Sequence, residues 1–107
     1  MLDRKDLHLT LLVALLAATL SAAPARKAVS IKGMKFDPAS LEVAVGDSVR
    51  WTNGDDRDHT VAAADGSFKS GNLRSGDTFE HKFTKPGKFA YACSYHPRMK
   101  GTVVVKE

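Results

Sequence analysis

The residues with the clearest chemical potential lie close together near the C-terminus. Cys93, His96 and Met99 follow one another at intervals of three residues within one short segment, residues 93–99. A thiolate and a thioether are soft ligands and an imidazole is a borderline one, a combination that suits copper. Two histidines and a cysteine, with a weakly bound methionine, make the form of such a site that transfers electrons. The segment therefore predicts three ligands of a copper ion, and one more histidine must come from elsewhere in the chain.

Three other histidines could complete such a site. His8 belongs to the N-terminal segment considered below, and His81 alternates with two phenylalanines, which predicts a side chain packed in the interior or at its edge. His59 stands where a polar loop, residues 53–58, enters a predicted strand, and loops of this kind converge at the ends of β-sandwiches. We therefore prefer His59 as the fourth ligand, with His81 as the alternative.

Residues 1–25 have the pattern of a signal peptide. Two basic residues near the start precede an apolar run at residues 9–20, and small residues follow it. The run is shorter than the roughly 20 residues that span a bilayer, so we expect no stable membrane anchor. We expect export, cleavage after residue 25 with residue 23 as second choice, and a mature domain of residues 26–107.

Cys93 is the only cysteine, so the mature domain cannot form an internal disulfide. A domain of about 80 residues has a small core, and exported domains of this size usually add disulfides. A free thiol in an oxidising compartment would be reactive unless something occupied it. A bound metal would protect the thiol and stabilise the domain.

The net charge of +4 comes from basic residues scattered along the chain. Scattered charges of this kind are typical of a solvated sheet surface. The chain has no basic run and no basic residues interleaved with aromatic ones, so nucleic-acid binding is not expected. Arg98 and Lys100, beside the predicted metal loop, could steer an acidic protein partner.

From residue 28 onward the chain has the alternation of short strands and no helical apolar stripe. Residues 41–45 and 49–53 alternate around Gly46-Asp47, which predicts a hairpin with one buried face, and a change of parity at Gly33 predicts a bulge or bend. Cys93 continues the face of the strand before it, so its sulfur is predicted to point between the sheets. Seven to eight strands at this spacing predict an all-β sandwich of two sheets.

Two parts of the sequence together resemble the small blue copper proteins, the cupredoxins. These parts are residues 59–61, HTV, and residues 93–105, CSYHPRMKGTVVV. The two-residue gaps on both sides of His96 are similar to those of amicyanin rather than plastocyanin. The likeness runs from about residue 28 to residue 107 and includes residues 36–38, FDP, and 45–51, VGDSVRW.

The resemblance implies a Greek-key β-sandwich and one copper ion, Cu(II) or Cu(I), bound by His59, Cys93, His96 and Met99. It implies a periplasmic protein that carries single electrons and is not an enzyme. Redox partners, a donor dehydrogenase or a c-type cytochrome, would dock around His96. We expect the mature cupredoxin domain to be a monomer.

Thr60 and Arg98 depart from the family's pattern. Many members have Asn at the position of Thr60, and a hydroxyl replaces the amide only in part. Arg98 stands where amicyanin-like sequences tend to have an apolar residue of the docking patch, which here would include Pro97 and Met34. Because residues around the ligands tune a metal site, the likeness to amicyanin does not predict the reduction potential or which particular redox protein is the partner.

Other functions fit these residues less well. Zinc could bind His59, Cys93 and His96, but structural zinc favours more thiolates and copper(II) outcompetes zinc on the same ligands. A Cys/His hydrolase would need a cleft and a third orienting residue, which the sequence does not suggest. The main alternative is a copper-binding module for storage, delivery or resistance without electron transfer, because the same ligands serve both purposes.

Overall fold

Eight strands in two four-stranded sheets form the domain. The computed structural model describes residues 23–107, so most of the predicted signal peptide, residues 1–22, lies outside the described residues. The strands are β1 (Arg26–Lys32), β2 (Lys35–Asp37), β3 (Ser40–Ala44), β4 (Ser48–Asn53), β5 (Ala62–Ala63), β6 (Thr78–Lys82), β7 (Gly87–Ala92) and β8 (Lys100–Lys106). The predicted all-β sandwich is confirmed. Within residues 23–107 there is no helix long and apolar enough to cross a membrane.

The two sheets have the strand orders β2-β1-β4-β6 and β3-β8-β7-β5. β3 pairs in parallel with β8, and β4 pairs in parallel with β1. The hairpin predicted around Gly46-Asp47 is therefore wrong, because this turn leads the chain from one sheet to the other. Asp47 holds the turn by accepting hydrogen bonds from the N–H groups of Ala44 and Ala25, at 2.9 and 2.8 Å. Alternation correctly identifies Val43, Val49 and Trp51 as buried, because side chains alternate between faces in either arrangement. Val45, predicted on the same face as Val43, is 41% exposed where the turn begins.

The bulge or bend predicted at Gly33 is a tight hairpin turn between β1 and β2. Lys32 lies opposite Lys35, and the two residues between them, Gly33 and Met34, have φ angles of 60° and 61°. Positive φ at both central residues is what a two-residue hairpin of type I′ requires. The apolar residues change from odd to even positions because the chain reverses its direction at this turn, not because a residue bulges out of a strand. Met34 is thereby held at the tip of the turn.

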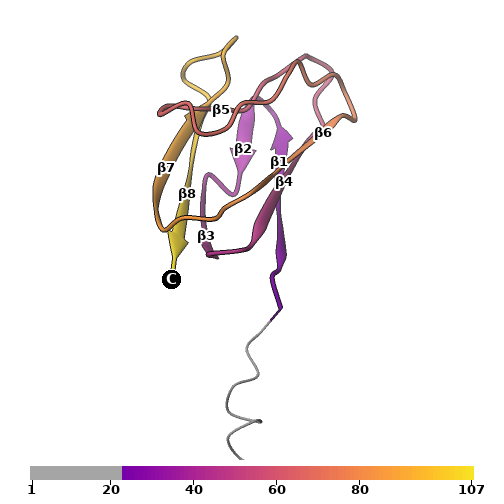
Figure 1. The fold of residues 1–107 in the computed structure, drawn as a ribbon. Coiled ribbons are helices and arrows are strands. Elements are labelled where there is room, and N and C mark those ends of the chain that lie inside the picture. The colour runs from indigo at the N-terminus through magenta and orange to yellow at the C-terminus, as the bar shows by residue number, and fades with distance from the viewer. Residues whose placement is uncertain (1–22) are drawn as a thin grey trace, which may run out of the picture.

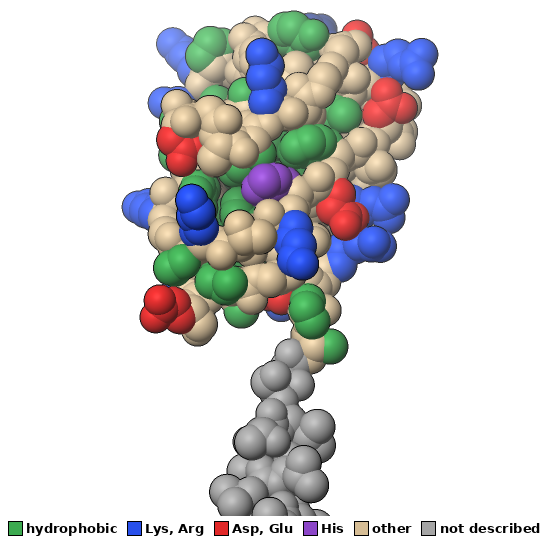
Figure 2. Space-filling model, in the orientation of Figure 1, with side chains coloured by type: hydrophobic (Ala, Val, Ile, Leu, Met, Phe, Trp, Pro, Cys, Tyr) green, Lys and Arg blue, Asp and Glu red, His purple; other side chains and the backbone are tan. Residues whose placement is uncertain are grey.

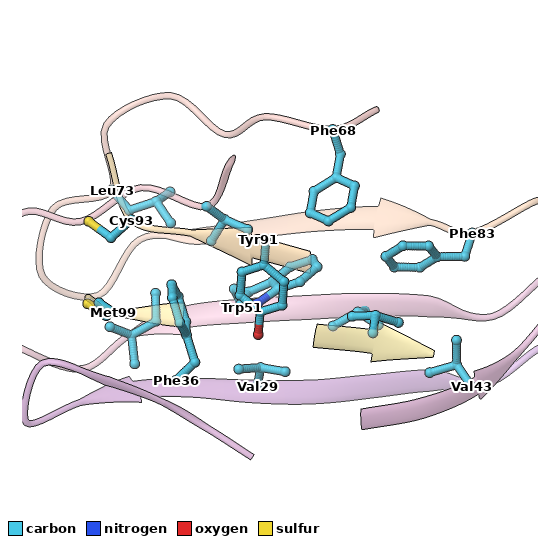
Figure 3. Packing of buried hydrophobic residues seen from close by; sticks show 14 of the residues in the cluster. Val29, Phe36, Val43, Trp51, Phe68, Leu73, Phe83, Tyr91, Cys93 and Met99 are labelled. Atoms are coloured by element: carbon cyan, nitrogen blue, oxygen red, sulfur yellow. The ribbon is translucent and has the colours of Figure 1, made fainter. Parts of the chain in front are cut away.

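Aromatic side chains fill the space between the sheets around Trp51 (Figure 3). Trp51 is fully buried, and its ring centroid lies 5.4 Å from that of Tyr91 and 5.7 Å from those of Phe68 and Phe79. Tyr91 stands two residues before Cys93 on the same buried face. The core thus continues directly into the end of the sandwich that carries the cysteine.

Figure 1 shows the connections β4–β5 and β7–β8 at the same end of the domain, away from the C-terminus. The first connection contains His59 and the second contains residues 93–99. Two segments that are far apart in the sequence therefore meet at one end of the sandwich.

Gly101 should tolerate no side chain, because it lies opposite Tyr91 in the β7–β8 pair. A methyl group at Gly101 would overlap the tyrosine ring, which is 2% exposed and cannot move into solvent. We expect Gly101→Ala to lower the free energy of unfolding by about 1–3 kcal/mol, the usual cost of overpacking. Urea unfolding of the metal-free protein measures the change.

Gly71→Ala is the matched control, because an added methyl group there would meet nothing within 4 Å. Its effect should stay within about 0.5 kcal/mol, as for ordinary surface substitutions. Equal stability of the two variants would show that the core accommodates the methyl group after all.

Candidate metal centre

His59, Cys93 and His96 offer one ligand atom each, and these atoms lie within 4.8 Å of one another. The Sγ atom of Cys93 is 3.8 Å from Nδ1 of His59 and 3.7 Å from Nδ1 of His96. His59 and Cys93 are buried, whereas His96 is half-buried. The structure thus brings three of the four predicted ligand residues together, with only His96 reaching toward solvent.

His59 is held in place by backbone bonds to Leu73 rather than by a regular strand. The N–H of His59 donates to the carbonyl of Leu73 at 3.0 Å, and the N–H of Leu73 donates back at 2.8 Å. The strand predicted to begin at His59 is reduced to the two residues of β5. These two reciprocal hydrogen bonds hold the backbone of His59 against that of Leu73, whose side chain is buried, and so determine the position of His59.

Backbone bonds also close the loop of residues 93–99. The N–H of Cys93 donates to the carbonyl of Met99 at 3.0 Å, and the N–H of Met99 donates to that of His96 at 2.9 Å. Met99 is 4% exposed, and Figure 3 shows its sulfur at the same end of the core as that of Cys93. The short loop therefore holds its three candidate ligands in a closed turn.

His81 lies on β6 opposite Val49 and is not a member of the cluster within the part of the chain that the structure describes. Its ring stacks on Phe68 at 4.9 Å and meets the edge of Phe83 at 4.8 Å, and burial lowers its pKa. His81 lines a surface hollow with Phe83 and Phe89. On the face of the domain shown in Figure 2, a histidine is visible with hydrophobic side chains beside it. His81 is thus packed against the aromatic core.

Thr60 ties the two ligand-bearing segments together. Its N–H donates to the Sγ atom of Cys93 at 3.4 Å, and its hydroxyl accepts a bond from the N–H of Ser94 at 2.8 Å. The hydroxyl lies 4.0 Å from Sγ, too far for a strong bond to the sulfur. Thr60 therefore joins the segments mainly through the backbone next to Cys93.

The surroundings of Cys93 favour its thiolate. Burial disfavours the charged form, but hydrogen bonds to Sγ, chiefly from the N–H of Thr60, outweigh it and lower the pKa of the thiol to about 6. The thiolate is the form that binds metal ions. At neutral pH the side chain is thus mostly in its metal-binding form.

Asp55 is a contact of the site that the sequence did not predict. Its carboxylate lies 2.9 Å from Nε2 of His59, the ring nitrogen turned away from Cys93. The N–H of Met34 is the main cause that keeps the pKa of this carboxyl below its ordinary value. In the sequence Asp55 is one of three aspartates in a polar loop, so only its spacing of four residues from His59 could have drawn attention to it.

The donor set fits copper. Two imidazole nitrogens and a thiolate are borderline and soft ligands, and no carboxylate oxygen belongs to the cluster among the described residues. Hard cations such as calcium and magnesium prefer sites made of oxygen atoms. A trigonal arrangement of two histidines and one cysteine, with a methionine nearby, is typical of copper sites.

Comparison with known proteins agrees with this chemistry. The sequence matches the family of the cupredoxin-like domain over residues 7–105. It is 39% identical over 88 residues to amicyanin-alpha from Methylorubrum extorquens, covering 73% of this chain and 70% of that protein. The chain spans 63% of the length of two Paracoccus amicyanins.

Solved structures of the same fold are also similar. A purple cupredoxin from Nitrosopumilus maritimus matches with a TM-score of 0.69 and 33% identity, over 75% of this chain and 99% of that one. A copper-containing nitrite reductase from Thermus scotoductus matches with a TM-score of 0.72 and 34% identity, over 82% of this chain but 23% of its own. The chain therefore belongs to the cupredoxin-like family, and its cofactor is copper.

Proposed function

We propose that this protein is a blue copper protein that carries single electrons, with one copper ion held by His59, Cys93, His96 and Met99. The observation that carries the proposal is the meeting of two imidazoles and the only thiol within 4.8 Å. The buried methionine sulfur at the same end of the core supports the fourth ligand. A copper ion in this site would supply one-electron chemistry between Cu(II) and Cu(I).

The protein itself fixes the positions of the candidate ligands and excludes water from the sulfur of Cys93. His59 and Cys93 have exposed fractions of 0% and 1%, so water cannot reach the sulfur from their side. The N–H of Thr60 points at Sγ, and the loop of residues 93–99 is closed by its own backbone bonds. Ligands fixed in this way need little rearrangement when the charge of the site changes, which favours fast electron transfer.

His96 is the ring through which an electron would enter or leave. It is half-buried and lines a mostly apolar hollow with Met34, Tyr95, Pro97 and Arg98. Met34 and Tyr95 are 36% and 53% exposed and lie together in this hollow, and grouped exposed apolar side chains mark interaction sites. We propose that a redox partner, a donor dehydrogenase or a c-type cytochrome, docks here, with Arg98 adding a positive charge at the contact.

We further propose that residues 1–25 direct export to the periplasm and are removed, leaving residues 26–107 as a monomeric electron carrier and not an enzyme. The signal-like composition supports cleavage, and β1 beginning at Arg26 is compatible with it. The amicyanin relative supports an electron carrier. The mass of the exported protein would identify the cleavage site.

The alternative is a copper-binding module that stores or delivers the ion without electron transfer. Electron self-exchange of the copper protein, together with the rate of copper loss to a chelator, distinguishes the two. Because His59 and Cys93 are buried, we expect slow loss of copper. Because His96 reaches a mostly apolar hollow at the surface, we expect fast self-exchange. Slow self-exchange with ready loss would instead support copper handling.

A further inference from the structure

Asp55 connects His59 to a turn at the surface of the domain. One carboxylate oxygen, Oδ2, accepts a bond from the N–H of Met34 at 3.0 Å and lies 2.9 Å from Nε2 of His59. The other oxygen, Oδ1, accepts a bond from the N–H of Gly33 at 2.7 Å. The same carboxylate therefore contacts the buried histidine and both residues of the β1–β2 turn.

The contact determines which nitrogen of His59 carries the proton. An ionised carboxylate only accepts hydrogen bonds, so Nε2 of His59 must be the donor. In a neutral ring Nδ1 is then unprotonated, and Nδ1 is the atom that lies 3.8 Å from Sγ of Cys93. Asp55 thus favours the tautomer whose free electron pair is on the side of the proposed metal ion.

Asp55 is itself held in position from several directions. Its N–H donates to the side-chain oxygen of Asn53 at 2.9 Å. The side-chain nitrogen of Asn53 donates to the carbonyls of Arg57 and Leu73, at 2.8 and 2.9 Å. Leu73 is also the residue that pairs with the backbone of His59. The carboxylate can therefore act as a fixed support for the imidazole.

Desolvation strengthens the contact between Asp55 and His59. The side chain of His59 is 0% exposed and that of Asp55 is 14% exposed. A charge so close to a buried ring is only weakly screened by salt. The carboxylate of Asp55 would therefore raise the basicity of His59 and stabilise the higher charge of a bound Cu(II) ion more than that of Cu(I).

We propose that Asp55 is a positioning residue of the metal site, which fixes the tautomer of His59, tightens Cu(II) binding and lowers the reduction potential. This inference rests on the proposed binding of copper by His59. Asp55 also holds the turn that places Met34 in the hollow beside His96, so the docking surface and the buried ligand share one support.

Asp55→Asn and Asp55→Ala test the proposal, with Asp56→Asn as the matched control. Asp56 is the neighbouring aspartate and is exposed, so its neutralisation removes the same charge without touching His59. Nitrogen NMR of the metal-free proteins reads the tautomer of His59 directly. Competition titration with a copper chelator and electrochemistry of the copper-loaded proteins give the affinity and the potential.

We expect metal-free wild type and Asp56→Asn to hold His59 with its proton on Nε2, and Asp55→Ala to mix the tautomers. Loss of such an outer partner typically costs about 10- to 100-fold in metal affinity. If the loss is tenfold larger for Cu(II) than for Cu(I), the potential rises by about 59 mV. The reduction potential of Asp55→Asn should be well above that of Asp56→Asn. This comparison of the two asparagine variants is the second test if Asp55→Ala does not fold.

The proposal is overturned if the tautomer survives in Asp55→Ala, or if the two asparagine variants shift the potential equally. Failure of the proposed function has a different signature, namely a wild-type copper(II) complex without intense visible absorption. In that case the tautomer measurement on metal-free protein still decides whether Asp55 fixes the ring of His59.

Discussion

Replacing Cys93 by serine should abolish the intense visible absorption of the copper(II)-loaded protein. The band is expected from charge transfer between a thiolate and copper(II), and Cys93 is the only thiol in the sequence. Serine has nearly the same size, so the 1% exposed position should remain packed. Visible spectra of the two copper-loaded proteins measure the effect, which we expect to be a complete loss of the band.

Ser94→Ala is the control for this experiment. The side chain of Ser94 is exposed, and the bond of Ser94 to Thr60 uses only its backbone N–H, so the band should persist. An equally intense band in Cys93→Ser would mean that the absorption arises elsewhere. A colourless wild-type copper(II) complex would contradict the proposal of a blue copper site.

Replacing His59 by alanine should weaken copper(II) binding by more than the roughly 100-fold that loss of an outer partner can cost. The reason is that Nδ1 of His59 lies 3.8 Å from the thiolate sulfur, and no other histidine among the described residues could replace it without moving a strand. Competition titration of the metal-free variant with a copper chelator measures the loss.

His81→Ala is the matched histidine control. It removes a ring that packs on Phe68 and Phe83, so we expect a loss of about 0.5–3 kcal/mol in the free energy of unfolding with copper affinity unchanged. Urea unfolding and the same titration separate the two effects. If His81→Ala lost as much affinity as His59→Ala, His81 would have to be counted among the ligands.

The sequence by itself determined the fold class and most of the candidate site. Alternation in residues 49–53 correctly identifies Val49, Trp51 and Asn53 as buried, because successive side chains of a strand point to opposite faces. Cys93, His96 and Met99 belong to one short loop, so their proximity follows from the chain itself.

Only the tertiary structure decided which strands pair and what surrounds the ligands. β3 and β4 alternate as a hairpin would, yet they lie in different sheets, because periodicity reports which side is buried and not which strand is the partner. The bonds from Gly33 and Met34 to Asp55, and the place of Met34 beside His96, both depend on how the β1–β2 turn packs against the β4–β5 connection. Local spacing is fixed by covalent geometry, whereas contacts between distant segments are fixed by packing and hydrogen bonding in the folded domain.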